Sequence, residues 1–251
     1  MNSDNKINGK GNSYSKYRPS YPKEYIDYLV KENNLNKYSK VFDVGAGTGI
    51  LSEILAKRGL NVTAVEPNLD MAVFIQDLTK EYLNLNFINT LAEDISYNKK
   101  DVDLITVAQA FHWFDINKFN KQCKNILKDS GKVALLWNVR DENDKIIKES
   151  FDICKRLCEK FQGFSGGIGD NIDNIKNFFK DEKYNYAEFE NNLEYDIEMF
   201  IGRNISASYA PNEGDKNYKI FIDELTDLFN RYKKNEKVII KNKVKSYIGS
   251  I

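Results

Sequence analysis

The chain has 251 residues, of which 41% are hydrophobic, and its 37 basic residues balance its 37 acidic residues. This composition supports a large buried core, so we expect one large domain or one domain with an inserted cap. Neutral charge disfavours a nucleic-acid partner, and the absence of a long apolar run disfavours a membrane-embedded protein.

The start of the chain lacks the apolar core of a signal peptide, so a cytoplasmic protein is expected. The cysteines are Cys123, Cys154 and Cys158, and the only histidine is His112. An odd, small number of cysteines in such a chain favours reduced thiols. Cys154 and Cys158 share an apolar helical stripe, so we expect helix packing and no metal site.

The N-terminal part divides into two segments. Residues 1–13 are polar and punctuated by glycine, which predicts a disordered tail. The next segment contains Tyr17, Arg18 and Tyr21 among prolines, and we expect it to form a lid. Pro22 then suits the start of a helix.

Apolar runs typical of buried strands alternate with helical periodicity up to residue 138. We expect strands at 41–44, 61–65, 85–89, 102–107 and 132–137, and helices after residue 49, at 69–82 and at 117–127. This alternation predicts a doubly wound parallel α/β sheet. The cofactor-binding core with its N-terminal lid is therefore assigned to residues 14–138.

Beyond residue 138 the pattern changes. Residues 139–235 are expected to form a mostly helical cap with a connecting strand, and residues 236–251 to hold a closing strand of the core sheet at 238–248. The lysines of that strand have two interpretations, a strip that binds RNA or protection of a sheet edge against pairing. Neutral net charge favours the second.

The most informative stretch is Val41-Phe42-Asp43-Val44-Gly45-Ala46-Gly47-Thr48-Gly49, an apolar strand followed at once by three glycines. Helical periodicity begins directly after it. Glycines allow positive φ angles and the close approach of a ligand, and a helix start offers unpaired N–H groups. The order of strand, glycine turn and helix therefore predicts a nucleotide-type binding turn.

The spacing of the glycines limits which class of nucleotide the turn could bind. A dinucleotide fingerprint requires glycine where Ile50 stands, which argues against an NAD-dependent reductase. The lysine of a phosphate-binding P-loop is absent, which argues against that loop. Glu66, at the end of the second strand, is placed to accept hydrogen bonds from two ribose hydroxyls. Asp43 has two interpretations: it orients the glycine loop, or it faces the cationic amino-acid end of a sulfonium cofactor.

Several motifs extend this reading. The strand and glycine turn resemble the first motif of the class I S-adenosylmethionine-dependent methyltransferases, Val65-Glu66-Pro67-Asn68 resembles the segment after it, and Leu91-Ala92-Glu93-Asp94-Ile95 resembles the stretch that wraps the adenine. Three further segments, 17–22, 108–114 and 206–211, are similar to the small-molecule group labelled methyltransferase type 11 or trans-aconitate-methyltransferase-like. The resemblance covers roughly residues 14–250.

This resemblance implies a Rossmann-like seven-stranded sheet with an antiparallel last strand, and S-adenosylmethionine as cofactor with S-adenosylhomocysteine as product. It also implies cofactor contacts by Arg18, Asp43, Gly45, Ala46, Gly47, Glu66, Pro67, Asn68, Met71, Ala92, Glu93 and Gln109. The glycine turn would hold the methionine part, Glu66 the ribose, and Gln109 would lie under the sulfonium. Many relatives carry a polar residue at the position of Leu91, where backbone contacts and packing would replace its hydrogen bond.

Methyl transfer requires mainly alignment of donor and acceptor and exclusion of water. A general base is needed only where the acceptor loses a proton, and His112 is the candidate because its pKa suits base work near neutral pH. The alternative is a hydrogen-bonded spacer between two aromatic residues. Both interpretations remain open at this point.

The acceptor pocket is expected around the loop after the fourth strand, the lid and the cap. Its candidate residues are Tyr17, Tyr21, His112, Trp113, Phe114, Ser208 and Tyr209. Trp113 and Phe114 line that pocket or pack beneath the cap. Arg18 clamps the cofactor carboxylate or an acidic acceptor, because a guanidinium fork suits carboxylates, or it is a solvated side chain.

The predicted function is transfer of a methyl group from S-adenosylmethionine to a small-molecule acceptor by a monomer or homodimer. O-, N- and carboxyl-methylation remain open. The alternatives are a catalytically silent S-adenosylmethionine-binding regulatory protein and, after it, an NAD-dependent reductase. Asp43 and Glu66 are both present, which argues against a silent protein.

Overall fold

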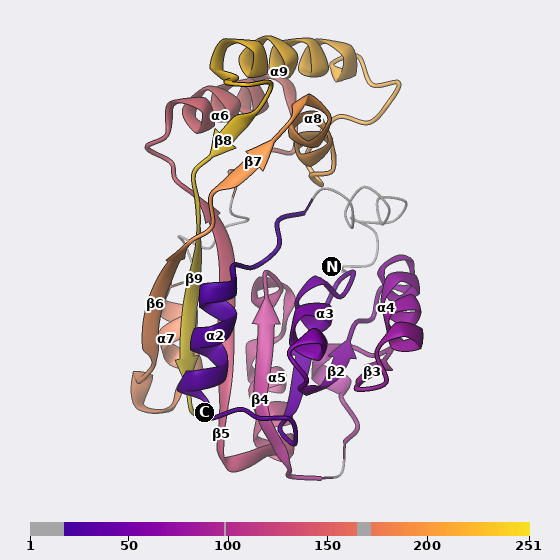
Figure 1. The fold of residues 1–251 in the computed structure, drawn as a ribbon, viewed down its shortest axis with the longest axis vertical. Helices are drawn as coiled ribbons and strands as arrows, with labels where there is room; N and C mark the ends of the chain where they lie inside the picture. Colours follow the sequence, from indigo (N-terminus) through magenta and orange to yellow (C-terminus); the bar gives the residue numbers. More distant parts are fainter. Residues whose placement is uncertain (1–17, 98, 165–171) are drawn as a thin grey trace.

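Seven strands form one sheet at the centre of the computed structural model, which describes residues 18–97, 99–164 and 172–251 (Figure 1). The spatial order is β3 (Leu85–Ile88), β2 (Asn61–Val65), β1 (Lys40–Val44), β4 (Val102–Ala108), β5 (Leu127–Arg140), β9 (Asn242–Gly249) and β6 (Asn185–Glu190). Strands β1 to β5 pair in parallel, and β9 is antiparallel to both β5 and β6. The predicted doubly wound sheet with an antiparallel last strand is confirmed.

Helices cover both faces of this sheet, as the almost fully apolar parallel strands require. One face carries α5 (Ile116–Ile126), α7 (Ile172–Phe178) and the short helix η2 (Ala92–Asp94). The other face carries α2 (Lys23–Glu32), α3 (Ile50–Lys57) and α4 (Leu69–Glu81). In α5, Phe119, Cys123 and Ile126 recur at helical spacing and are fully buried, so this helix packs by its apolar stripe.

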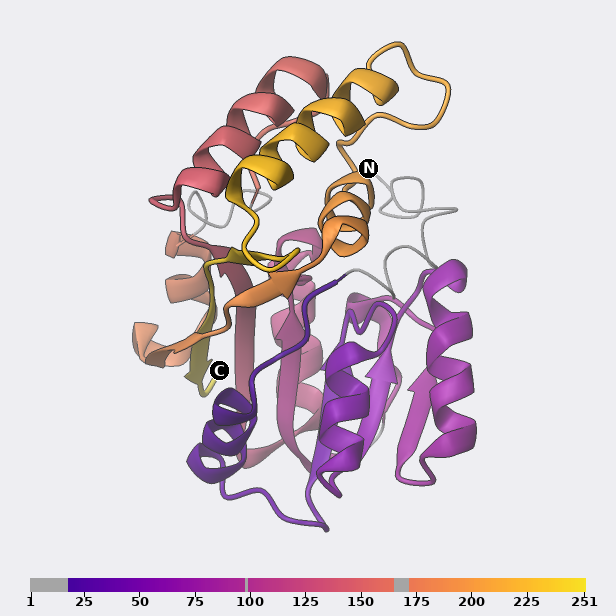
Figure 2. The same cartoon turned by 45° about the horizontal axis from the view of Figure 1, so that its top comes forward.

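A separate layer, called the cap below, lies over the carboxyl ends of the central strands (Figures 1 and 2). It consists of α6 (Lys145–Leu157), α8 (Ile197–Ile205), α9 (Tyr218–Tyr232) and a two-stranded sheet of β7 (Leu193–Tyr195) and β8 (Val238–Ile240). The cap has an apolar cluster of its own, in which Phe200, Phe221 and Leu225 are buried. The cap therefore packs around a core separate from that of the central sheet.

The closing strand differs from its prediction. The sequence predicts one strand over residues 238–248, but the structure divides it at Lys241. β8 pairs with β7 in the cap, whereas β9 pairs with β5 and β6 in the core. Buried positions alternate without interruption across Lys241. Only the partner strands set the division, and a local pattern does not show them.

The structure also places α7 and β6 in the core, although both lie within residues 139–235. The lysines of β9 do not protect a sheet edge, because β9 is an interior strand. Lys243 forms a salt bridge of 3.0 Å with Glu188 on the adjacent strand β6. This cross-strand pairing accounts for a basic residue at that position.

The cysteine thiols are free and buried, Cys123 in the core and Cys154 and Cys158 in the cap. Among the described residues, no group of three histidine, cysteine or acidic side chains is placed to hold a metal ion. In the same part of the chain, no helix combines the length and apolar character needed to cross a membrane.

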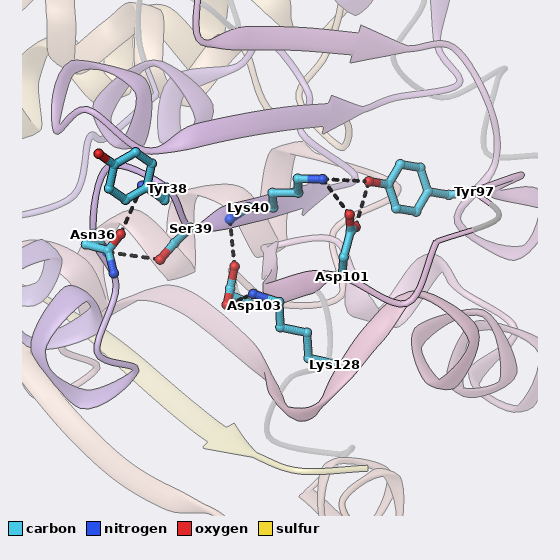
Figure 3. A network of polar contacts seen from close by, with 8 residues as sticks. All are labelled: Asn36, Tyr38, Ser39, Lys40, Tyr97, Asp101, Asp103 and Lys128. Carbon is cyan, nitrogen blue, oxygen red and sulfur yellow. Dashed lines mark hydrogen bonds and ion pairs between the residues drawn. The ribbon is translucent and has the colours of Figure 1, made fainter.

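A polar network holds the amino-terminal edge of the sheet (Figure 3). Lys40, at the start of β1, donates its N–H to Asp103 Oδ2 at 2.8 Å, and its Nζ pairs with Asp101 Oδ2 at 2.5 Å. Tyr97 donates to Asp101 Oδ1 at 2.8 Å, and Lys128 to Asp103 Oδ1 at 2.6 Å. These residues lie at the opposite end of the strands from the glycine turn, so the network fixes strand ends.

Candidate functional site

The glycine turn joins β1 to α3 at the carboxyl end of the sheet. Gly45, Gly47 and Gly49 have φ angles of 70°, 59° and 83°, in the left-handed region that favours glycine. A Cβ on Gly45 would lie 2.4 Å from the Cβ of Ala110, in the loop after β4. Glycine is therefore required at this position both by the turn and by the loop packed against it.

The backbone of this turn is bonded within the protein. The N–H groups of Gly45 and Ala46 donate to Val65 O at 2.8 and 3.1 Å. Gly47 donates to Glu66 Oε2 at 2.8 Å, and Gly49 donates to Ala46 O at 2.9 Å. These four amides are thus already engaged, so they do not form an open nest for a phosphate group.

Glu66 connects the two loops that follow β1 and β2. Its Oε1 accepts a hydrogen bond from the N–H of Asn68 at 2.9 Å, in addition to the bond from Gly47. The side chain of Asn68 in turn accepts from Met71 N at 3.2 Å and caps α4. Glu66 has 8% of its surface exposed, at the carboxyl edge of the sheet. The Glu66 carboxylate therefore holds the glycine turn and the loop after β2 together.

Asn89 supports this corner, and the sequence analysis does not identify it. Its Nδ2 donates to Glu66 O at 2.8 Å and to Pro67 O at 3.1 Å. The only sequence signal for Asn89 is its position directly after β3. Pro67 takes part through its backbone carbonyl, which accepts the second hydrogen bond from Asn89.

Asp43 is fully buried beneath the turn. Its Oδ2 accepts a hydrogen bond from Ser52 Oγ at 2.6 Å, and its Oδ1 accepts from Thr106 Oγ1 at 2.8 Å. Burial raises the pKa of Asp43 to about 6, and the two hydroxyl bonds oppose that rise. With both oxygens bonded to α3 and β4, this geometry favours the loop-orienting interpretation of Asp43 over contact with a cofactor.

Gln109 turns the chain directly after β4. It adopts φ of 60°, which costs a residue with a Cβ conformational energy and is common at functional sites. Its N–H donates to Leu136 O at 2.9 Å, and its Nε2 donates to Asn138 O at 3.1 Å. The side chain is therefore held across the ends of β4 and β5, facing the cap side of the sheet.

The aromatic segment after Gln109 forms the short helix η3 (Phe111–Trp113). Phe111 is buried against Trp137 and Phe178, at centroid distances of 6.4 and 5.0 Å. Phe114 packs against Phe119 and also lies next to Gly45, where it supports the glycine turn. This placement favours packing for Phe114, one of its two predicted roles.

His112 and Trp113 occupy different positions from their aromatic neighbours. Trp113 is 45% exposed, with its ring centroid 4.8 Å from that of His112. The Nδ1 of His112 is buried and has no hydrogen-bond partner in the described part of the chain. Burial lowers the pKa of His112, so the neutral imidazole predominates at neutral pH.

The residues predicted at the adenine belong to two elements: Met71 lies in the first turn of α4, and Leu91, Ala92 and Glu93 lie at the start of η2. Met71 and Ala92 are buried, whereas Leu91 is 43% exposed. Glu93 accepts the N–H of Asp115 on its Oε1 at 2.7 Å and accepts Gln122 Nε2 on its carbonyl at 2.8 Å. The side chain of Glu93 therefore stabilises the start of α5.

The remaining predicted residues lie toward the lid and cap. Tyr21 packs on the α2 side of the core, 6.3 Å from the ring of Tyr25. Tyr209 packs in the cap against Phe161 at 4.8 Å, and Ser208 is exposed. Tyr17 and the 1–13 tail lie outside the described residues.

Three arginines act on the same tyrosines at the junction of cap and core, and the sequence analysis predicted only Arg18 among them as a site residue. Arg140 ends β5, and Arg203 lies in α8. The charges of Arg18, Arg140 and Arg203 all lower the pKa of Tyr195 and Tyr209, although burial raises both pKa values overall. These five side chains therefore cluster between cap and core. Only the position of Arg140 near the carboxyl end of a strand could have indicated that residue.

Comparisons with known proteins agree with this geometry. Residues 42–135 match the sequence model of a family described as a methyltransferase domain. An uncharacterized methyltransferase of Mycobacterium tuberculosis is 36% identical over 144 residues, which cover 57% of this chain and 56% of the relative. An uncharacterized methyltransferase of Schizosaccharomyces pombe is 32% identical over 151 residues, covering 60% and 57%. The match thus spans about half the length of the curated relatives.

The fold is also shared with solved structures. A methyltransferase from Anaeromyxobacter dehalogenans superposes with a TM-score of 0.66 at 17% identity, covering 93% of this chain and 98% of that one. The chain is thus similar to methyltransferases in sequence over residues 42–135, and in fold over most of its length. A phosphoethanolamine N-methyltransferase of Haemonchus contortus, solved in complex with S-adenosylhomocysteine, superposes with a TM-score of 0.54 at 15% identity, covering 96% of this chain and 57% of that one.

Proposed function

We propose that this protein transfers a methyl group from S-adenosylmethionine to a small-molecule acceptor bound between the sheet and the cap. The observation that carries the proposal is the internal bonding of the glycine turn. The amides of Gly45, Ala46, Gly47 and Gly49 all donate to protein acceptors. A pyrophosphate would need such donors, whereas a sulfonium cofactor carries no phosphate.

The residues present fit this cofactor. Gly45 and Gly47 adopt positive φ in the turn, and Glu66 lies beside it at the carboxyl end of β2, where its carboxylate can meet ribose hydroxyls. Leu91 offers a partly exposed apolar side chain for packing on the adenine. When bound, the cofactor supplies an activated methyl group on a sulfonium leaving group.

The chain's own residues then align the acceptor and exclude water. Gln109 is fixed at the ends of β4 and β5 by its bond to Asn138, at the place predicted for the sulfonium. His112, neutral and with an unbonded Nδ1, is our proposed base for an acceptor that must lose a proton. Trp113 is the exposed aromatic side chain of this loop and would cover the acceptor.

Calorimetric titration with S-adenosylmethionine, S-adenosylhomocysteine and NAD tests the cofactor. We expect binding of the two sulfur compounds and none of NAD. Glu66→Ala should weaken S-adenosylhomocysteine binding at least tenfold, about 1.4 kcal/mol. Glu53→Ala, which removes an acid of α3 that pairs with Lys57, should leave it unchanged. Binding of NAD without any response to the sulfur compounds would overturn the proposal.

A further inference from the structure

Three connections between the core and the cap are bonded to one another where β5, β9 and β6 end (Figure 1). The first follows β5, the second joins β6 to β7, and the third joins β8 to β9 at Lys241. Asp141 N donates to Lys241 O at 2.9 Å, and Asn191 N donates to Asn242 O at 2.8 Å. A movement of the cap relative to the sheet would therefore act on all three connections together.

The side chain of Asn138 lies at the centre of this junction. Asn138 belongs to β5 and pairs with Val244 of β9. Its Oδ1 accepts Asn191 Nδ2 at 2.7 Å and Asn242 Nδ2 at 3.0 Å. Asn191 Nδ2 also donates to Ser20 O at 2.9 Å, and Asn138 Nδ2 lies 3.5 Å from the same carbonyl. One amide therefore joins β5 to two of the connections and to the segment before α2.

The backbone of Asn138 holds Gln109 on the other side. The carbonyl of Asn138 accepts Gln109 Nε2 at 3.1 Å, and the N–H of Gln109 donates to Leu136 O at 2.9 Å. Gln109 has φ of 60°, a conformation that persists only where the surrounding contacts hold it. Since both acceptors belong to β5, the position of this strand at Asn138 sets the conformation of Gln109.

The amide of Asn138 interrupts an apolar part of β5. Leu135, Leu136 and Trp137 before it are buried, and an apolar side chain at residue 138 could continue that packing. Asn242, which bonds to Asn138, is only 3% exposed. Burying amides is unfavourable unless they are bonded, and bonded amides select one arrangement of the groups around them. The pair therefore fixes how the connections to the cap sit on β5.

We propose that Asn138 is a positioning residue for methyl transfer: its side chain fixes the cap connections and the segment before α2, and its carbonyl fixes the Gln109 amide. The position of the cap and the conformation of Gln109 then change together. Asn138 acts through Gln109 and takes no part in the chemical step. The inference rests on the proposed methyl transfer for the place of Gln109 beside the cofactor.

Hydrogen exchange of the full chain, followed by NMR at the Gln109 N–H, tests this link. Asn191→Ala removes the side chain that bonds Ser20 and Asn138. An effect of this change at Gln109 must pass through Asn138, and we expect exchange there to become at least about threefold faster. Asn138→Leu, which has nearly the same size and no polar side-chain atom, should speed it about tenfold. Adding Asn191→Ala to Asn138→Leu should have no further effect.

Two variants separate positioning from a general loss of stability. Asn138→Asp keeps an oxygen for Asn191 and Asn242, so it should restore exchange at Gln109 to within about twofold of wild type. Asn84→Leu is the matched control, because Asn84 Nδ2 also donates two hydrogen bonds, of 2.8 Å each, but does so near the start of β3. It should leave exchange at Gln109 unchanged relative to exchange in the buried strand β4.

Titration with S-adenosylhomocysteine keeps this inference apart from the proposed function. In wild type the compound should slow exchange both at Gln109 and in β7, whereas in Asn138→Leu the effect on β7 should be lost. Asn138→Leu should also raise its Kd at least about threefold, and Asn84→Leu should not. Absence of binding would overturn methyl transfer, and exchange in the free protein would still decide the link between Asn191 and Gln109.

If Asn138→Leu does not fold, Asn191→Ala decides, because Asn191 lies outside the strands. Equal exchange at Gln109 in wild type and Asn191→Ala overturns the role of Asn138. An equal rise in Asn84→Leu overturns it as well, since the effect would then reflect stability alone.

Discussion

Asp43 offers a direct test of how the core supports the glycine turn. Its pKa rises to about 6 from the ordinary 3.8 because burial penalises the carboxylate. The folded protein therefore binds this proton more tightly than the unfolded chain. The contribution of Asp43 to stability is fully present below the unfolded pKa and is lost as pH rises through about 6.

The size follows from the same values. The difference between about 6 and 3.8 is about 2.2. At about 1.36 kcal/mol per pKa unit, this corresponds to at most about 3 kcal/mol. Asp43→Asn removes the titration and keeps the shape of the side chain. The free energy of unfolding of wild type minus that of Asp43→Asn should thus fall by up to about 3 kcal/mol between about pH 4 and pH 8.

Urea unfolding followed by circular dichroism measures this difference across the pH range. Asp129→Asn is the control, because Asp129 is exposed and its bond from Lys100 lowers its pKa. Any pH dependence from Asp129 should have the opposite sign. A difference between wild type and Asp43→Asn that is constant with pH, or that grows toward pH 8, would refute the reasoning.

Three further predictions concern the turn and the loop after β4. Gly45→Ala should destabilise the protein by about 1–3 kcal/mol in thermal unfolding, because its Cβ would meet Ala110 at 2.4 Å. Gly59→Ala, at an equally positive φ with no atom within 4 Å, should cost less. Gln109→Gly should be about 1 kcal/mol more stable toward urea than Gln109→Ala, since both lose the side chain and only glycine accepts φ of 60° without cost. Burial lowers the pKa of His112, so with an acceptor that must lose a proton the methylation rate should fall on the acid side below pH 6.5. His112→Gln should abolish this fall in rate. A fall that begins above pH 6.5 would contradict the assignment of His112 as the base.

Local patterns predicted most of the core. The strand before the glycine turn and the helices after it follow from apolar periodicity, which depends on neighbouring residues alone. The extent of β5 did not follow from such a pattern. Its last residue, Arg140, pairs with Asn242, about a hundred positions away in the chain, so its end depends on a distant partner.

The sequence predicted those residues of the candidate site that belong to a single motif. Glu66 stands at a fixed place after β2, but its bonds to Gly47 and Asn68 depend on loop geometry that the sequence does not show. The grouping of Arg140, Tyr195 and Arg203 could not be predicted, since these residues come from three separate elements. No local sequence pattern marks any of them, and only the folded structure brings them together.

The position of β9 has a consequence for the order in which the sheet can form. β9 follows the other strands of this sheet in the sequence, yet it lies between β5 and β6 and is the only strand of the sheet that pairs with β6. Until β9 is in place, β5 presents an unpaired edge and β6 has no partner in the sheet. Removal of residues 242–249 would expose that edge permanently and favour aggregation. The attachment of β6 to the parallel strands therefore depends on β9, the strand of the sheet that is synthesised last.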